Sequence, residues 1–128
     1  MHKNIKICCL SSRDVYHKLY TEAQKDAYTS YLRGKRCKTE NDFLVEISSS
    51  FQFTYYFGEN WQAFNECIQD LEWLKFNRIF VLFDDFTQSF CAQTEIQEAL
   101  QNRTIDYFGR MIEYWESEGK DVEIWINN

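Results

Sequence analysis

Proline is absent from this 128-residue sequence, and glycine and histidine are scarce, with four and two copies. Without proline, the ends of helices have to be located from capping residues and from the glycines. With two histidines and no Cys-x-x-Cys pair, the sequence lacks the ligand spacing of a structural zinc site. Glycine-rich phosphate loops and the Gly-x-Ser-x-Gly motif of serine hydrolases are missing too. We therefore expect a protein that is not an enzyme and that holds no metal and no cofactor.

Long hydrophobic runs are missing as well. The apolar run of residues 5–10 is short and interrupted by Lys6, unlike the hydrophobic region of a signal peptide. Nothing approaches the roughly 18 apolar residues of a membrane helix. The five cysteines have no regular spacing, which is typical of a reduced cytosolic protein. We expect a cytoplasmic protein that forms one domain over residues 1–128, a length at which a single hydrophobic core is normal.

Positive charge is scarce beyond the first third of the chain. Residues 1–12 carry a net charge of +2, residues 13–38 carry +4 and residues 39–128 carry −12, which gives −6 overall. A field of negative sign attracts basic partners and repels nucleic acid. The charge pattern therefore favours a basic protein partner and argues against direct binding of nucleic acid.

The order of the predicted elements indicates an α/β fold. The expected strands are residues 4–10, 78–86 and 121–127, and the expected helices are residues 13–33, a helix beginning at Thr39, residues 61–73 and residues 104–118. Residues 92–102 fit either a short helix or a loop. Strands that alternate with helices predict a small parallel sheet covered by helices.

Capping residues support several of these boundaries. Thr39 has the side chain of an N-cap, and Asp42 follows three residues later as in a capping box. Asn60 is a suitable N-cap for the helix of residues 61–73. Gly34 and Gly119 follow the predicted helices that precede them, as a glycine at a helix C-terminus does.

An acidic and amide-bearing stripe is the most distinctive local pattern. Glu59, Gln62, Glu66 and Asp70 follow one another at steps of three, four and four residues, so a helix places them on one face. Such a face is ordinarily the solvated side of an amphipathic helix. The aromatic and glycine-containing hinge beside it favours a protein-binding centre instead, because exposed Tyr and Trp next to charge are typical of interfaces. The alternative is that the aromatic residues of the hinge fill the core, which we expect at least of Phe57 and Trp61.

Two other groups of residues have alternative interpretations. Asp84 and Asp85 end a predicted buried strand, where an α/β enzyme could hold Mg²⁺, although aspartate is also a common turn residue. Basic residues cluster around Gly34, namely Arg33, Lys35, Arg36 and Lys38. They could contact RNA or an acidic protein face, or form the solvated end of a helix.

The run YYFGENWQAFNECIQDL, residues 55–71, resembles the signature of the barstar family, the intracellular inhibitors of secreted ribonucleases. The segments KTENDFLVEISSSFQF, RIFVLFDDF and MIEYWESEGKDVEIWIN are similar to flanking parts of that family, as is the strand of residues 4–10. The resemblance implies a three-stranded parallel sheet packed against helices, with residues 13–35 as an inserted basic helical segment. A non-nuclease partner for the same scaffold is the alternative.

The resemblance also implies a mode of action. Family members place the signature helix and the preceding loop in the basic active site of a nuclease, where acidic side chains take the positions of RNA phosphates. A bacterial toxin ribonuclease as target would make the chain an immunity protein. The residues expected to contact the partner are Tyr55, Tyr56, Gly58, Glu59, Asn60, Trp61, Gln62, Asn65, Glu66 and Asp70.

Several positions depart from the family pattern. Glu66 takes the place of the central acidic anchor, but Gln62 stands where the best-known inhibitors carry a second aspartate. Asn65 replaces a tryptophan, and Tyr114 replaces a glutamate in the last helix. These differences concern the identity of the target more than the mode of binding.

Overall fold

The computed structural model describes residues 1–52, 60–69 and 75–128. Tyr55, Tyr56, Gly58, Glu59 and Asp70, all expected to contact a partner, lie outside the described residues. The elements in chain order are β1 (Ile5–Cys8), α1 (Ser12–Gln24), β2 (Ala27–Arg33), α2 (Glu40–Phe51), α3 (Trp61–Gln69), β3 (Arg78–Asp84), α4 (Gln97–Ser117) and β4 (Asp121–Asn127), with 3₁₀ turns at Gly34–Arg36 and Phe86–Gln88.

The four strands in the described part of the chain form one parallel sheet with the order β1-β4-β3-β2. The prediction of an α/β fold with a parallel sheet is confirmed, but the expected number of three strands is wrong. The additional strand is β2, which pairs along its whole length with β3, from Ala27 opposite Arg78 to Arg33 opposite Asp84. It forms one edge of the sheet, and β1 forms the other.

The prediction of one helix over residues 13–33 is wrong in its second half. Helix α1 ends at Gln24, and Asp26 turns the chain with a left-handed φ of 58° before β2 begins. Ala27 and Tyr31 have helical spacing from α1, yet in β2 they lie on the α1 side of the sheet. A helix and a strand both place residues that are four apart on the same face, so this spacing does not distinguish them. The pairing of β2 with β3 shows that the segment is a strand.

Gly34 does not end a helix, as the sequence suggested, but allows two backbones to approach closely. A Cβ atom at this position would lie 2.1 Å from the carbonyl oxygen of Asp85 and 2.7 Å from that of Asp84. Only glycine fits such an approach. The turn after β2 is therefore packed directly against the turn after β3.

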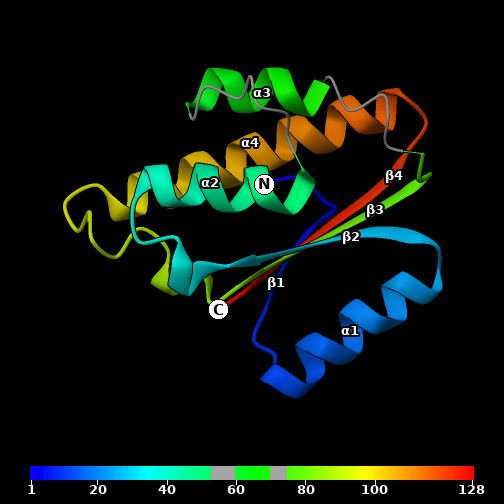
Figure 1. The fold of residues 1–128 in the computed structure, drawn as a ribbon, viewed down its shortest axis with the longest axis horizontal. Coiled ribbons are helices and arrows are strands. Elements are labelled where there is room, and N and C mark those ends of the chain that lie inside the picture. Colours follow the sequence, from blue (N-terminus) through cyan, green and yellow to red (C-terminus); the bar gives the residue numbers. More distant parts are fainter. Residues whose placement is uncertain (53–59, 70–74) are drawn as a thin grey trace.

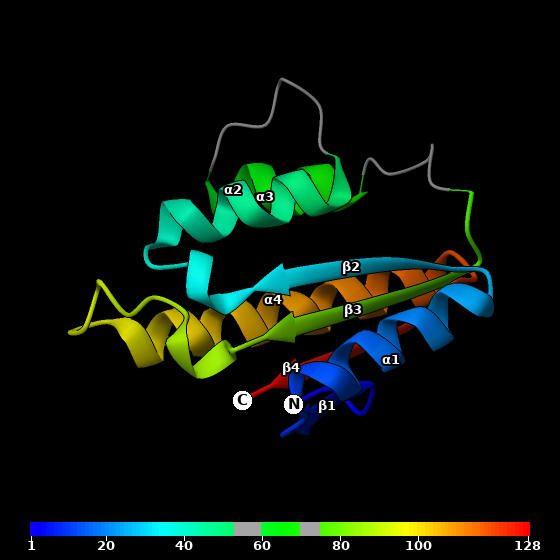
Figure 2. The same cartoon turned by 60° about the horizontal axis from the view of Figure 1, so that its bottom comes forward.

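Helices cover both faces of the sheet. Helices α2, α3 and α4 lie on one side and α1 lies on the other (Figures 1 and 2). Strand β3 serves both layers, because Ile79, Val81 and Phe83 belong to the larger core while Phe80 and Leu82 belong to the smaller core under α1. The sequence of residues 78–86 predicts a strand that is buried on both faces, and the burial of β3 confirms this prediction.

The other boundaries agree with the capping signals except at α4. The Thr39 hydroxyl accepts a hydrogen bond from the amide of Asp42 at 3.1 Å, and Gly119 follows α4 with a φ of 83°. Helix α4 begins at Gln97, before residue 104, and its N-cap Ile96 makes no side-chain capping bond. No helix in the described ranges is long and apolar enough to cross a membrane.

A buried carboxylate joins the N-terminal helix to the sheet. The side chain of Glu22 on α1 is fully buried. It accepts a hydrogen bond from Arg78 Nε at 2.9 Å and forms an ion pair with Lys18 Nζ at 2.8 Å. Burial alone would raise the pKa of Glu22, but the bonds from Arg78 and Lys18 outweigh burial and lower this pKa to about 2. Arg78 also contacts Asp121 and Glu123 on β4.

We expect the substitution Glu22→Gln to lower the free energy of unfolding at pH 7 by about 2 kcal/mol, because it leaves Arg78 and Lys18 without the buried charge that compensates them. The folded pKa lies below the ordinary value of 4.5, so this stabilisation is present above pH 4.5 and is lost as the pH falls towards 2. Urea denaturation of the wild type and of Glu22→Gln between pH 7 and pH 2 measures this loss of stabilisation.

The matched control is Asp121→Asn, which removes an exposed carboxylate from the same arginine and should cost less than about 1 kcal/mol. A stability difference between wild type and Glu22→Gln that stays constant down to pH 2 would contradict the assignment.

Candidate functional site

Helix α3 is fixed at its first turn by the side chain that precedes it. The Oδ1 atom of Asn60 accepts a hydrogen bond from the amide of Ala63 at 2.8 Å, as the sequence predicted for an N-cap. Phe64, Cys67 and Ile68 are buried on the inner side of the helix. Because these residues define the inner face, the opposite face of α3 points to solvent.

The solvent-facing side of α3 carries the two members of the predicted stripe that lie within the described residues. Gln62 and Glu66 are exposed, and Asn65 is half-buried. The amide Nε2 of Gln62 donates a hydrogen bond to Oε1 of Glu66 at 3.3 Å. An exposed bond of this kind contributes little to stability, so it holds the Glu66 carboxylate only weakly.

Trp61 packs against the core, as the sequence allowed. Its ring lies 5.5 Å from that of Phe43 on α2 and 4.9 Å from that of Tyr107 on α4, centroid to centroid. Its indole Nε1 donates a hydrogen bond to a carboxylate oxygen of Glu40. The half-buried Trp61 therefore positions the start of α3, and only part of its surface is open to a partner.

Two aromatic residues of α4 hold the other end of α3. The hydroxyl of Tyr114 donates to the carbonyl of Gln69 at 3.1 Å, and Trp115 Nε1 donates to the carbonyl of Ile68 at 3.3 Å. These two bonds join the last described residues of α3 to α4. Tyr114, a departure from the family pattern, therefore has a structural role in this chain.

The aspartate pair at the end of β3 is part of the sheet's own hydrogen bonding. The carboxylate of Asp84 accepts hydrogen bonds from the hydroxyl of Tyr31 at 2.8 Å, from Asn127 Nδ2 at 2.8 Å and from the amide of Asp85 at 3.0 Å. Burial raises the pKa of Tyr31, and the bond to Asp84 raises it further. Asp84 thus ties the ends of β2, β3 and β4 together.

No cluster of three or more metal-ligating side chains occurs in the described ranges. The donors around Asp84 are protein groups, which is the arrangement expected of a structural carboxylate.

The basic residues around Gly34 are not equivalent. The guanidinium of Arg33 donates to both carboxylate oxygens of Glu46, at 2.8 and 3.1 Å, and the Arg33 amide donates to the same side chain at 2.9 Å. The charge of Arg33 is therefore already paired within the protein. Lys35, Arg36 and Lys38 are exposed.

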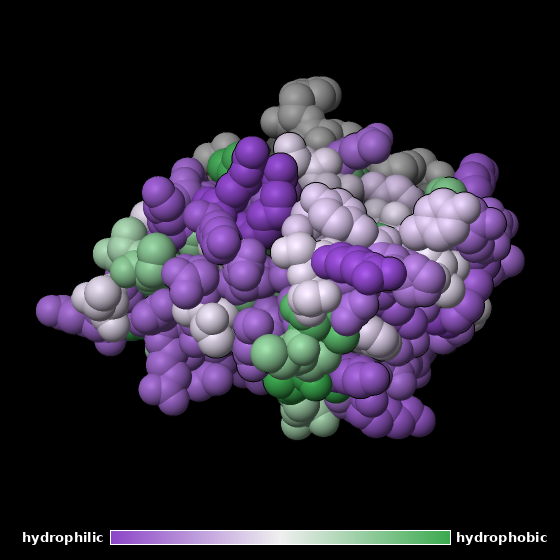
Figure 3. All heavy atoms as spheres, turned by 90° about the horizontal axis from the view of Figure 1, so that it is seen from below, coloured by the Kyte–Doolittle hydropathy of each residue, from purple (hydrophilic) through white to green (hydrophobic). Residues whose placement is uncertain are grey.

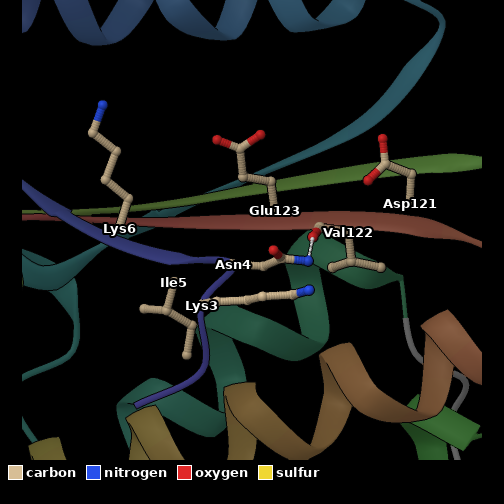
Figure 4. A pocket seen from close by; sticks show the side chains of 7 residues that line it. All are labelled: Lys3, Asn4, Ile5, Lys6, Asp121, Val122 and Glu123. Atoms are coloured by element: carbon tan, nitrogen blue, oxygen red, sulfur yellow. Dashed lines mark hydrogen bonds between the residues drawn. The ribbon is translucent and has the colours of Figure 1, made fainter.

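The face formed by α1 lies across the sheet from α3. Figure 3 shows this face, on which hydrophilic side chains surround a small hydrophobic patch. A hollow of about 320 Å³ lies beside β1 and β4, with Lys6, Glu123 and Asp121 turned towards α1 (Figure 4). Glu123 and Asp121 both pair with Arg78, so the two carboxylates in this hollow serve the network around Glu22.

The N-cap of α3 gives a direct test of how the site is held. Replacing Asn60 with alanine removes the bond to the Ala63 amide, and we expect it to cost about 1 kcal/mol of stability. Amide hydrogen exchange should accelerate in residues 61–69 more than in α2 or α4. Asn60→Ser is the matched control, because serine also caps helices. Equal stability of the alanine and serine variants would contradict the role assigned to this side chain.

Comparison with known proteins identifies the family of this chain. The family model described as Barstar (barnase inhibitor) matches residues 27–127, whereas comparison with curated proteins gives no match. The matched region begins with the first residue of β2 and ends with the last residue of β4. Strand β1 and helix α1 precede it, so residues 4–10 lie outside the match, although the sequence suggested that they belong to the shared part. Because the match covers well over half of the chain, this protein belongs to the Barstar (barnase inhibitor) family.

Proposed function

We propose that this protein inhibits a toxin ribonuclease in the cytoplasm, as an immunity protein, by covering the basic active site of the enzyme with the exposed face of α3. The family match supports a ribonuclease inhibitor. The single observation that carries the proposal is the exposed Glu66 on a helix whose inner face and both ends are fixed by the rest of the protein.

The chemistry of the proposed contact is that of a carboxylate among cations. A nuclease active site has to bind RNA phosphates, and it does so with positively charged side chains. A carboxylate accepts the same charge-assisted hydrogen bonds from arginine that a phosphate oxygen accepts. Glu66 supplies that group, and Gln62, which contacts it, and Asn65 on the same helix add amides that can donate or accept.

The distribution of charge along the chain also favours a basic partner that approaches α3. Residues 39–128, which contain α3, carry a net charge of −12, whereas residues 1–38 carry +6. Of this +6, β1 and α1 with their connections (residues 1–26) carry +2, and α1 lies on the far side of the sheet from α3 (Figures 1 and 2). The other +4 belongs to residues 27–38, at the end of β2 and in the turn after it. Complementary fields accelerate encounter and disfavour wrong orientations. The N-terminal layer therefore leaves the proposed contact face open.

Neutralising Glu66 tests this proposal. We expect Glu66→Gln to weaken inhibition of the target ribonuclease about 100-fold, within the range measured for close charge pairs in protein interfaces, the barnase–barstar complex among them. The measurement is the inhibition constant in an RNA cleavage assay with barnase and with purified toxin ribonucleases.

The control is Glu95→Gln, which removes the same charge from an exposed residue in the segment before α4. Both variants change the net charge by the same amount, so a much larger loss of inhibition in Glu66→Gln indicates a direct contact. Similar inhibition constants for the two variants would rule out Glu66 as the anchor. Absence of inhibition by the wild-type protein across the panel would count against the proposed function itself.

A further inference from the structure

A small pocket opens beside the start of α3, where that helix meets α2. It has a volume of about 170 Å³ and is lined by Glu40, Asn41, Leu44, Asn60 and Trp61. Pockets that hold whole small molecules measure roughly 300–1,000 Å³, and a water molecule occupies about 30 Å³. The volume therefore suits one side chain of a partner better than a cofactor or a metabolite.

The charged group that lines this pocket is the carboxylate of Glu40. Its Oε2 atom accepts hydrogen bonds from Trp61 Nε1 and, at 3.2 Å, from Arg103 Nη1. Both of these contacts fall on the same oxygen, and within the described residues no donor is recorded at Oε1. The side chain of Glu40 is 33% exposed, so its charge is only partly hydrated. Because the indole and Arg103 both contact Oε2, a further donor has to approach Oε1.

Arg103 shows which chemistry this corner of the molecule accepts. Its guanidinium pairs with Glu40 and also lies over the Trp61 ring, with the Cζ atom 5.7 Å from the ring centroid. A carboxylate next to an aromatic face is the combination that recognises guanidinium, through charge-assisted hydrogen bonds and cation–π attraction. Arg103 itself is half exposed, at 51%, and reaches Glu40 from α4.

We propose that this pocket binds an arginine side chain of the protein partner, with Glu40 as its carboxylate, the part of Trp61 that lines the pocket as an apolar wall and Asn41 as a flanking amide. Arginine fits better than lysine, because its planar fork donates in fixed directions and stacks on aromatic rings. The identity of the partner rests on the proposed function, since a cleft that binds RNA contains arginines beyond the one that meets Glu66. Arg103 is the internal competitor for the same carboxylate.

The chemistry of the pocket is tested without any partner protein. Nuclear magnetic resonance of the full chain follows the indole N–H signal of Trp61 during titration with L-argininamide at constant ionic strength. We expect a saturable shift, with weaker binding of L-lysinamide, which has the same charge but no guanidinium. In Glu40→Gln the dissociation constant for argininamide should rise about tenfold, the cost of losing a charge-assisted hydrogen bond.

A second variant separates binding from a defect in folding. In Arg103→Gln the internal competitor is gone, so argininamide should bind more tightly than in wild type, a result that damage to the fold cannot produce. Glu95→Gln should bind as wild type does. A shift that rises linearly without saturation, or equal dissociation constants in wild type and Glu40→Gln, would overturn the proposal.

The RNA cleavage assay then tests whether an arginine of the nuclease occupies the pocket. Glu40→Gln should weaken inhibition about tenfold relative to Glu95→Gln, the amount expected for one charge-assisted contact. If Glu66→Gln weakens inhibition and Glu40→Gln does not, the inferred arginine contact is wrong while the proposed function stands. If no ribonuclease is inhibited by the wild type, the proposed function fails, and the argininamide titration still decides whether the pocket recognises guanidinium.

Discussion

The position of α3 depends on the packing of its first residue, Trp61, between α2 and α4. The ring contacts Phe43 and Tyr107, and the indole nitrogen is held by Glu40. Bonds from Tyr114 and Trp115 hold the last carbonyls of the helix. With both ends fixed and Phe64, Cys67 and Ile68 buried, rotation of α3 would break the core. The face that carries Glu66 is therefore set by packing rather than by the charge it presents.

The N-terminal layer lies outside the part of the chain that matches the Barstar family, yet it is joined closely to the sheet. Strand β1 covers the outer edge of β4, and α1 covers the second face through Val15 and the buried Glu22. This layer, residues 1–26, carries a net charge of +2, and α1 lies on the side of the sheet opposite α3 (Figure 2). It therefore does not cover the side of α3 that carries Glu66, and it buries Phe80 and Leu82 on the other face of the sheet.

Features that depend on neighbours in the sequence could be predicted, whereas features that depend on distant contacts could not. The caps at Thr39 and Asn60 and the buried strand near residue 80 follow from local residue type and spacing. Local spacing predicts helix for the residues of β2, because Ala27 and Tyr31 fit both periods and only pairing with β3 distinguishes them. Nothing in the local sequence marks Glu40, since its partners come from α3 and α4, and no spacing in the sequence connects the three elements.

The most direct test of the account is amide hydrogen exchange of this protein, free and mixed with the ribonuclease that we propose as its target. Burial of an amide in an interface slows its exchange with solvent. The account predicts that slowing is greatest in residues 60–69, extends to the start of α2 near Glu40, and leaves α1 unchanged. Slowing confined to α1, with residues 60–69 exchanging as in the free protein, would contradict the claim that α3 is the inhibitory surface.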